Sequence, residues 1–586
     1  MKNEEHILSA EKPERFFFRV SADDFRKISG SPIAYWVSNN VRGLFSNEET
    51  FESAFVIKAG MCTGKNEVFI LSWPEVEFDL IRKYLDKRYD YVPHNKGGEF
   101  RKWMGNLDAV LKYSKVHLHE MQKNLGFRHD GKEYYFQEHV GWSKITSSTS
   151  SFRFYPEGFS FDSAGLALFS NDKNSLYDAL GFLNSKISAM LIQLLNPTLN
   201  VTPQILKKLP LIRVNSEHRA KYITLFEQSK ADWDSYETSW DFTYLPLLQS
   251  DYRHSTLKAT YNGLRAHWRD MTLEMQRLEE ENNRIFIDAY GLKDELTPEV
   301  PLSEITLTCN PHYRYSNNKN AEELEVLLLA DTMKEFVSYA VGCMFGRYSL
   351  DKPGLILANQ GETIEDYWNH VRAYQNLPTA NCPLPTDSIF LPDVDNVIPI
   401  LDGDWFTDDI SERFSKFLRL TFGDEHYEEN LKFIEVALGK NIRKYFLKDF
   451  YNDHVRRYKK RPIYWLFSSS KGSFNALIYM HRYRSDTVSV VLNYLREFRI
   501  KLTTQKNHIE AVSISASASP GEKTKALKEI ESIRKIIEEL DSYEREILYP
   551  LATEQLEIDL DDGVKVNYQK FGPALRKIPG LDSKED

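Results

Sequence analysis

The feature that most constrains the fold is one long helical pattern over residues 257 to 292. This stretch reads LKATYNGLRAHWRDMTLEMQRLEEENNRIFIDAYGL, and the proline-containing stretch 298 to 301 follows it. A helix of this length makes about ten turns, and proline marks a place where such a pattern stops. The sequence therefore predicts that the chain from about residue 216 onward is built mainly from long helices.

Further helical patterns continue to the end of the chain. We expect helices over 323 to 345, 410 to 460, 485 to 511 and 521 to 548. The last of these carries an apolar stripe made of Leu527, Ile530, Ile533, Ile537, Leu540 and Ile547. That stripe predicts packing against the helix ending near 511 as an antiparallel pair, with SISASASPG as the turn between them.

The sequence before residue 216 has a different pattern of apolar and polar residues. Short aromatic and β-branched runs (AYWV, EVFIL, FRFY, FSFD) alternate with Gly, Ser, Asn and Pro, which is typical of strands and turns. Residues 174 to 195 are expected to be helical and to stop at Asn196-Pro197. The predicted fold class is an α+β multidomain protein, with a β-rich or mixed domain followed by a mainly α-helical carboxy-terminal region that ends in a long antiparallel helical pair. The predicted divisions are a tail over 1–19, the mixed domain over 20–215, a helical spacer over 216–349, an irregular insertion over 350–409 and a helical domain over 410–586.

Composition narrows the class of protein. The 586 residues include 75 Lys+Arg and 85 Asp+Glu, a net charge of -10, which argues against a uniformly basic surface but allows local basic ones. The cysteines, Cys62, Cys309, Cys343 and Cys382, are far apart in sequence, so we expect neither a metal site nor a disulfide framework. No apolar run approaches the roughly 20 residues of a membrane helix, and the start MKNEEH is not a signal peptide. We expect a cytoplasmic protein with no membrane partner.

Residues 310 to 313 read NPHY, one residue away from the Asn-Pro-Pro-Tyr motif with which amino-methylating DNA methyltransferases hold a flipped base. Asn310 and Tyr313 could bind and stack on such a base. However, His312 replaces the second proline, and the sequence has no G-x-G turn of the kind that usually binds a methyl donor. We therefore interpret NPHY as structural and predict no catalytic residue in this chain.

Two loops of the mixed domain have a composition that suits nucleic acid. AGMCTGKNEVFIL, 59 to 71, places Lys65 and Asn66 in a turn before a strand, and PHNKGGEFRKWMGN, 93 to 106, contains Lys96, Arg101 and Lys102. Lys and Arg meet phosphates, Asn reads base edges, and glycine lets the backbone approach. The alternative for both segments is a solvated loop without a ligand.

A third loop is rich in hydroxyl groups. Six of the seven residues from Thr146 to Phe152 carry one, including Ser147, Ser148 and Thr149, and Lys144 and Arg153 flank them. Such loops contact phosphates or bases, although a polar β-turn has the same composition.

A fourth stretch, 440 to 485, has twelve Lys or Arg against two Asp, interleaved with aromatics such as Tyr458, Tyr464 and Trp465. Either it contacts a nucleic-acid backbone, or its basic residues pair internally with the acidic block from 393 to 429.

Several sequence blocks resemble a known family. ISGSPIAYWVS, GMCTGKNEVFIL, PHNKGGEFRKWMGN, FLNSK and LNPTLNVTPQILKKLPL resemble the target-recognition domain of large adenine-specific DNA methyltransferases. The blocks EENNRIFIDAYGLKDELTPEVPLSEITLTCNPHYRY, YAVGCMFGRYSLDKPG, RPIYWLFSSSKGSFNALIYMHRY and LDDGVKVNYQKFG are similar to the PglX-type enzymes of the BREX phage-defence systems. The FLNSK, NPT and ILKKLPL pattern is shared more widely with restriction-modification specificity domains.

This resemblance implies a DNA target-recognition domain over 20–215, in the carboxy-terminal half of a PglX-type adenine methyltransferase. It assigns double-stranded DNA contacts to Lys65, Asn66, Lys96, Arg101, Lys102, Lys144, Ser147, Ser148, Thr149 and Arg153. The family's donor-binding half and true Asn-Pro-Pro-Tyr motif are not in this sequence, so S-adenosylmethionine is expected only for the complete enzyme. Expected partners are double-stranded DNA and a catalytic half or other BREX proteins. The alternatives are a stand-alone, non-catalytic specificity subunit and a scaffold of a defence complex.

Overall fold

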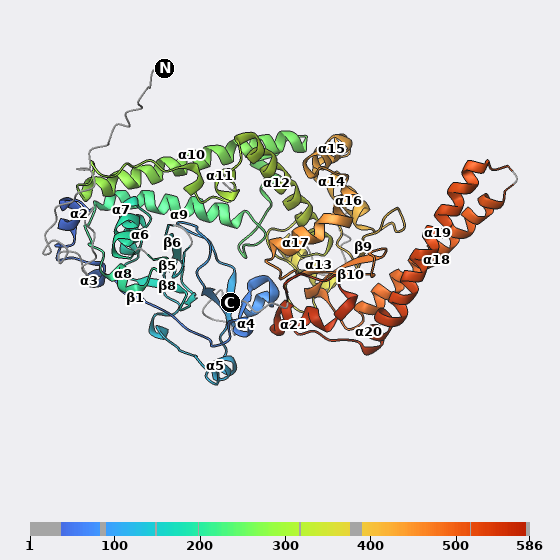
Figure 1. Cartoon of the computed structure of the whole chain (residues 1–586), viewed down its shortest axis with the longest axis horizontal. Coiled ribbons are helices and arrows are strands. Elements are labelled where there is room, and N and C mark those ends of the chain that lie inside the picture. The colour runs from blue at the N-terminus through green and yellow to red at the C-terminus, as the bar shows by residue number, and fades with distance from the viewer. Residues whose placement is uncertain are drawn as a thin grey trace, which may run out of the picture.

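The computed structural model of the protein describes residues 37–81, 90–146, 149–196, 198–315, 318–375, 390–515 and 517–581. The expected tail over 1–19 lies outside this range. The described chain is elongated, with the mixed region at one end, helices α9 and α10 running along it, and a helical hairpin at the other end (Figure 1). Both β-rich and helical parts are present, which confirms the α+β fold class. Among the described residues no helix has both the length and the apolar character needed to cross a membrane.

The mixed region contains two four-stranded sheets. The first has the order β1-β8-β5-β6 with antiparallel neighbours: β1 (Val56–Lys58), β8 (Gly165–Phe169), β5 (His139–Ser143) and β6 (Phe152–Tyr155). The second has the order β2-β4-β3-β7: β2 (Ile70–Ser72), β4 (Ala109–Lys112), β3 (Tyr91–Asn95) and β7 (Ser160–Phe161). In the second sheet β3 and β7 are parallel. Because β7 and β8 follow one another in the chain but belong to different sheets, residues 162–164 lie where the two sheets meet.

Helices cover this region on one side. The expected helical segment 174 to 195 is two helices, α6 (Lys173–Leu183) and α7 (Lys186–Leu195), because Ser185 caps the second with its side chain. α6 packs on α9 (Arg219–Asp234). The remaining short helices of the described chain are α2 (Asn39–Leu44), α3 (Phe51–Ala54), α4 (Asn66–Phe69), α5 (Lys115–Met121), α8 (Pro203–Lys207), α11 (Pro311–Arg314), α20 (Tyr549–Glu554) and α21 (Gly563–Lys570).

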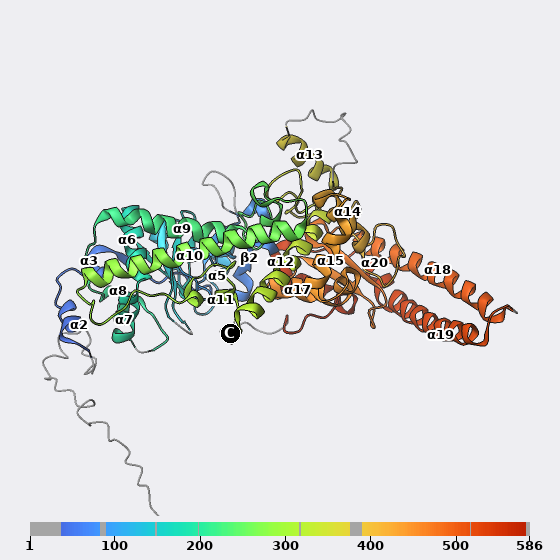
Figure 2. The ribbon, with the colours of Figure 1, turned by 90° about the horizontal axis from the view of Figure 1, so that it is seen from above.

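The long helix α10 (Leu257–Ala289) confirms the strongest expectation from the sequence. Thr256 caps it by accepting a hydrogen bond from the backbone N–H of Ala259. Its buried face includes Leu264, Trp268 and Met275, which recur at helical spacing. α10 lies alongside α9 and reaches from the mixed region to the second half of the chain (Figure 2). It therefore forms a continuous support between the two parts.

The second half is mainly helical but includes a small sheet. Its helices are α12 (Ala321–Met344), α13 (Ile364–Tyr374), α14 (Ile410–Phe422), α15 (Tyr427–Leu438), α16 (Ile442–Tyr445) and α17 (Tyr451–Arg457). A three-stranded sheet of the order β10-β11-β9 lies among them: β10 (Tyr464–Ser468), β11 (Asn475–Tyr479) and β9 (Ile398–Pro399). The expected irregular insertion 350–409 is therefore only partly irregular, since it contains α13, which begins with a capping box between Thr363 and Asp366.

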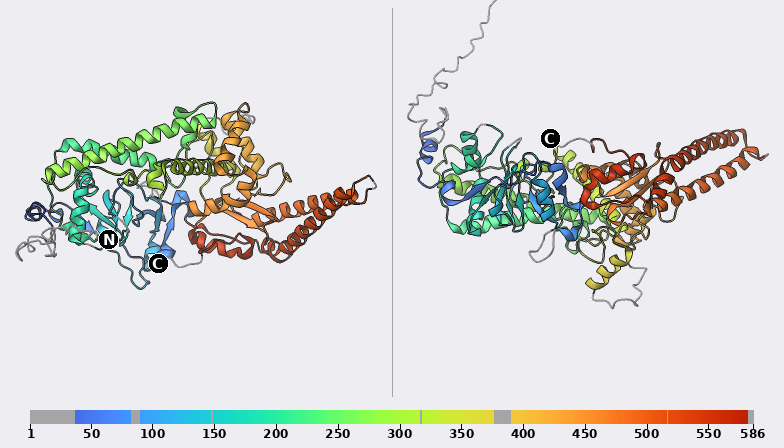
Figure 3. Two further views of the ribbon diagram at one scale, coloured as in Figure 1. Left: turned by 45° about the horizontal axis from the view of Figure 1, so that its top comes forward. Right: turned by 90° about the horizontal axis from the view of Figure 1, so that it is seen from below.

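The predicted antiparallel pair is confirmed. α18 (Thr487–Ile514) and α19 (Pro520–Tyr543) pack together and project from the body of the protein (Figure 3). The predicted stripe is shifted by one residue at the outer end, because Leu527 is 60% exposed and its neighbour Ala526 is buried instead. Near the body, Leu540 is fully buried as expected.

Candidate functional site

The NPHY segment forms the start of the short helix α11. The Asn310 side chain caps this helix by accepting a hydrogen bond from the His312 backbone N–H at 3.1 Å. Its amide nitrogen donates to the carbonyl oxygens of Leu302 and Ile305, each at 2.8 Å. Asn310 is fully buried. A side chain with both of its polar atoms already bonded inside the protein has no group left to hold a base.

The Tyr313 side chain also forms a hydrogen bond inside the protein. Its hydroxyl donates to the carbonyl oxygen of Phe100 at 2.6 Å, and burial raises its pKa. The contact joins α11 to the loop between β3 and β4, which contains Arg101. NPHY therefore forms a turn whose side chains bond inside the protein and position this loop.

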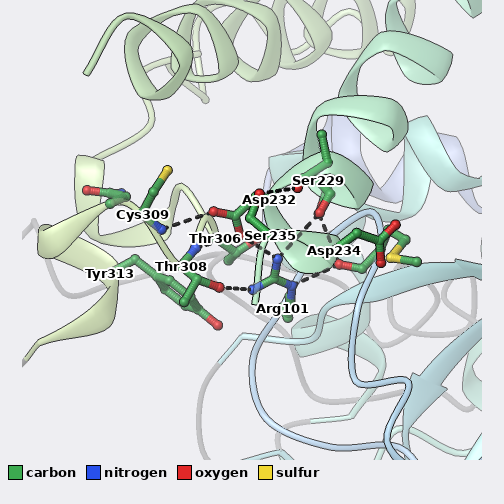
Figure 4. Close-up of polar contacts among 12 residues, drawn as sticks. Arg101, Ser229, Asp232, Asp234, Ser235, Thr306, Thr308, Cys309 and Tyr313 are labelled. Carbon is green, nitrogen blue, oxygen red and sulfur yellow. Dashed lines mark hydrogen bonds and ion pairs between the residues drawn. The ribbon is translucent and has the colours of Figure 1, made fainter. Parts of the chain in front are cut away.

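Arg101, predicted to contact DNA, is buried at the centre of a polar network (Figure 4). Its guanidinium donates to the Asp232 carboxylate and to the Thr308 hydroxyl, each at 2.8 Å, and to the carbonyl of Met104 at 2.9 Å. The same carboxylate accepts hydrogen bonds from the backbone N–H groups of Thr308 and Cys309. The prediction for Arg101 is thus corrected, because its charge is neutralised and its donors are occupied inside the protein.

The predictions for Lys102 and Arg153 are corrected as well, because both side chains are buried and bonded inside the protein. Lys102 forms a buried ion pair with Glu279 of α10, and the same carboxylate accepts a hydrogen bond from the Trp103 indole at 2.8 Å. Arg153 is fully buried and donates to the carbonyl of Arg101 at 3.1 Å and to the Ser143 hydroxyl at 3.3 Å. Together these cations fasten the loop to the helices and to the first sheet.

Other predicted contacts are at the surface. Lys65, Asn66, Lys96 and Thr149 are exposed, and Lys144 is partly exposed. Ser147 and Ser148 lie outside the described residues. Lys65 and Asn66 begin α4, where the Thr63 hydroxyl donates to the Asn66 side chain at 2.7 Å and accepts from the Lys65 backbone N–H at 3.1 Å. These bonds fix the turn and leave the lysine side chain pointing to solvent.

One short segment, residues 162–164, brings three of these loops together. The Asp162 N–H donates to Asn95 at 3.0 Å, next to Lys96. The Ser163 N–H donates to Met61 at 2.9 Å, just before the turn that contains Lys65. The Lys144 N–H donates to the carbonyl of Ala164 at 2.8 Å. The structure thus places three lysine-bearing loops from separate parts of the sequence around one backbone segment.

The Asp162 side chain stabilises this junction. Its carboxylate accepts from the Ala164 N–H at 2.7 Å and lies 3.5 Å from the His94 imidazole. Burial alone would raise the pKa of this carboxyl, but the hydrogen bond and charge of His94 hold the pKa below its usual value. Neither residue stands out in the sequence, because their pairing depends on contacts between β3 and β7.

The basic and aromatic stretch 440 to 485 is largely internal. Tyr458, Tyr464 and Trp465 are buried. Several of its cations pair inside the protein: Arg443 with Asp404 and Asp409, Arg457 with Glu237, and Arg461 with Glu75. Of these three, Arg443 pairs with residues of the acidic block from 393 to 429, and Arg457 and Arg461 pair with residues farther away in the sequence. Lys448 and Lys471 remain exposed.

The described residues include no group of three or more His, Cys, Asp or Glu side chains that could hold a metal ion. Cys62, Cys309 and Cys343 are free, and Cys382 lies outside the described ranges. Burial raises the pKa of the Cys309 and Cys343 thiols, so neither is a reactive thiolate.

Comparison with known proteins extends the family resemblance. No family model matches the sequence. The chain is 35% identical over 591 residues to "Adenine-specific methyltransferase BrxX" of Escherichia coli O9:H4 (strain HS), which covers 96% of this chain and 46% of the relative. It is also 35% identical over 604 residues to "Adenine-specific methyltransferase PglX" of Lacticaseibacillus casei (strain Zhang), which covers 97% of this chain and 46% of the relative. The chain spans about half the length of the curated relatives it matches. Over nearly its whole length, this chain is thus similar to part of two proteins named as adenine-specific methyltransferases, BrxX and PglX.

Proposed function

We propose that this chain recognises double-stranded DNA for a PglX-type adenine methyltransferase in BREX phage defence. The names of both relatives support adenine-specific methyl transfer as the reaction that it serves. In this proposal the chain supplies DNA binding, and a methyl-donor-binding half outside this sequence supplies the chemistry. S-adenosylmethionine would then bind that half, and Asn310 would keep its structural role.

The observation that carries this proposal is the gathering of three lysine-bearing loops around residues 162–164. Lys65, Lys96 and Lys144 come from separate turns of the mixed region, and the shared segment fixes their backbones. A fixed set of cations on a rigid support suits phosphates, which supply much of the affinity of DNA-binding proteins. Asn66 and Thr149, also on these turns, are exposed and carry groups that can bond to base edges or phosphates.

Glycine is needed at one of these turns. Gly97, next to Lys96, has a φ of +86°, and a Cβ there would lie 3.0 Å from the Ser143 hydroxyl. That hydroxyl donates to the carbonyl of Gly98 at 2.8 Å, which ties the turn to the end of β5. The close approach brings the Lys96 and Lys144 turns next to each other. This closeness is what one strand of a duplex would need in order to contact both.

The experiment compares the unmodified chain with the triple variant Lys65→Ala, Lys96→Ala, Lys144→Ala on a duplex of about 30 base pairs across a range of salt. Each lost phosphate contact should reduce the slope of log affinity against log salt by about 0.9. The matched control is Lys432→Ala, Lys525→Ala, Lys528→Ala, which removes the same charge from exposed sites of the second half. Equal DNA affinity and equal slope in the two triple variants would refute the proposal.

Calorimetry with S-adenosylmethionine tests whether the methyl donor binds outside this chain, as the proposal requires. The unmodified chain should give no heat of binding, with or without duplex DNA. Stoichiometric donor binding would show that this chain contains its own donor site and would remove the reason for assigning that role elsewhere.

A further inference from the structure

A cavity of about 820 Å³ lies in the second half, away from the loops discussed above. Three segments form its walls: the π-helical segment η9 (Phe446–Phe450) after α16, the loop between β10 and β11, and the chain from Tyr568 to Leu581. The four charged residues that line it are all cations, namely Lys448, Lys471, Arg576 and Lys577. Ser468, Ser469 and Ser470 add hydroxyl groups. A cavity lined by cations and hydroxyls, without an acidic residue, favours an anion.

The loop between β10 and β11 has a fixed shape. Glu539 of α19 lies beneath it and accepts hydrogen bonds from the Lys471 backbone N–H at 2.7 Å and the Ser473 hydroxyl at 2.5 Å. Gly472 has a φ of +73°, and its carbonyl accepts from the Asn475 side chain at 2.9 Å. The Glu539 carboxylate is engaged by these two donors and does not line the cavity, whereas Lys471 does. Glu539 therefore fixes the loop without adding a negative charge to the lining.

The opposite wall is fixed as well. The Arg576 backbone N–H donates to the carbonyl of Leu466 in β10 at 2.8 Å, and Leu575 pairs with Phe467 as an antiparallel bridge. The Tyr568 hydroxyl donates to the carbonyl of Arg576 at 2.5 Å. This segment therefore lies along β10 like an additional short strand, and it holds Arg576 and Lys577 opposite the serine-containing loop.

The four cations differ from the paired cations near them in having no acidic partner among the described residues. Most cations in the stretch 440 to 485 form ion pairs, as Arg443, Arg457 and Arg461 do. Within the described ranges none of Lys448, Lys471, Arg576 and Lys577 forms one. The Arg576 guanidinium instead lies 5.9 Å from the centre of the Tyr451 ring. Like charges on fixed segments repel, so an anion between them would relieve that repulsion.

We infer that this cavity is a binding site for phosphate groups. Three ammonium groups and one guanidinium supply charge-assisted donors, and the serine hydroxyls supply neutral ones. The phosphate could come from a free phosphate-containing ligand or from the backbone of nucleic acid, since both present the same anionic oxygens. Nothing in the lining selects a base, so the site would bind without reading sequence.

The first arm of the test uses inorganic pyrophosphate and the full chain. Thermal midpoints are measured with pyrophosphate and with sodium chloride at equal ionic strength, for the unmodified chain, the pocket variant Lys471→Ala, Lys577→Ala and the control Lys525→Ala, Lys528→Ala. Binding to the folded state raises the midpoint. Pyrophosphate should raise the midpoint of the unmodified chain and of the control but not of the pocket variant.

The second arm measures affinity for a duplex of about 30 base pairs in the same three proteins. If backbone phosphates are the source, the pocket variant should lose affinity for every duplex sequence alike, with a salt slope reduced by about 1.8 for two contacts. An effect in the first arm alone identifies a free phosphate ligand. Identical behaviour of the pocket variant and the control in both arms overturns the inference.

The two arms also separate this site from the proposed DNA function. If the unmodified chain binds no DNA, the proposed function fails, and the pyrophosphate arm still decides whether the cavity takes phosphate. If DNA binding is lost in the variant of Lys65, Lys96 and Lys144 but not in the pocket variant, and pyrophosphate has no effect, the proposed function stands and this inference fails.

Discussion

The guanidinium of Arg101 lies 2.8 Å from the carboxylate of Asp232, although the two residues are 131 positions apart in the sequence. Both side chains are almost fully buried, at 4% and 1% exposure. Asp232 belongs to α9, and Arg101 belongs to the loop between two strands of the second sheet. The pair therefore fastens the mixed region to the helical support.

Replacing Arg101 should reveal this structural role. Arg101→Ala leaves the Asp232 carboxylate buried without its partner, which costs about 3 to 5 kcal/mol of unfolding free energy. Chemical denaturation of Arg101→Ala and of Asp232→Asn should show a large loss in both, and the double variant should lose less than the sum of the two. Lys96→Ala, at an exposed site on the same loop, is the control and should stay within about 0.5 kcal/mol of the parent. A stable Arg101→Ala protein with weakened DNA binding would restore Arg101 as a DNA contact.

Asn310 offers a second test, at the segment that most resembles a catalytic motif. Asn310→Ala removes the cap of α11 and leaves the buried carbonyls of Leu302 and Ile305 without a donor. Each buried group left unsatisfied costs about 1 to 3 kcal/mol, so thermal denaturation should show a clear loss of stability. The control is His312→Ala, since the His312 side chain is only partly buried and the cap uses its backbone N–H. Unchanged stability in Asn310→Ala would contradict the structural interpretation of NPHY.

Periodicity predicted the elements that are long and uninterrupted. α10 and the pair of α18 and α19 follow from apolar residues at helical spacing, because that spacing is a local signal for an amphipathic helix. The helix α13 was missed, although its capping box at Thr363 is a local signal, because the surrounding Pro, Gly and Asn residues favour irregular structure. The sheet of β9, β10 and β11 was also missed, since β9 pairs with β11 across a long stretch of helices.

The sequence predicted candidate residues but not their surroundings. Lys96 and Arg101 belong to the same basic loop, yet the first is exposed and the second buried. The difference arises from Asp232, and for Lys102 from Glu279, which are distant in sequence and come close only when α9 and α10 pack. Charge and spacing within a loop contain no information about such partners. The same reason explains why the cation-lined cavity was not foreseen, because its walls come from three separate segments.

A third prediction concerns pH. His139 is fully buried, and burial lowers its pKa to about 4, against a weaker opposing effect of its hydrogen bond to Gln137. In the unfolded chain the His139 imidazole takes up a proton as pH falls below about 6.5. In the folded protein it takes up this proton only near pH 4. The free energy of unfolding therefore decreases as pH falls through this window, by about 3 kcal/mol for a shift of this size.

The measurement is the free energy of unfolding at several pH values between 7 and 4, from which a slope against pH is obtained. His139→Phe and His139→Gln both remove the titrating imidazole, and Phe keeps an aromatic ring on the stacked Tyr155, whose ring centre is 4.9 Å away. Both variants should show a flatter slope than the parent, whatever their stability at pH 7. Parent and variants with the same slope would show that His139 takes up its proton equally in the folded and unfolded states.

A fourth prediction uses the hairpin of α18 and α19, where the buried face departs from the predicted stripe. Ala526, Ile533 and Leu540 are buried at intervals of seven residues, the repeat of two packed helices. The predicted stripe instead began with Leu527, which is 60% exposed.

Leu540→Ala should lower the free energy of unfolding by about 2 to 5 kcal/mol because it empties a packed site. Leu527→Ala should change stability by less than about 0.5 kcal/mol, because that side chain contacts mainly solvent. The two variants delete the same atoms from one helix, so the difference between their denaturation midpoints isolates burial. A larger loss in Leu527→Ala would mean that the outer end of the hairpin packs through the predicted stripe, by a rotation of α19 relative to α18.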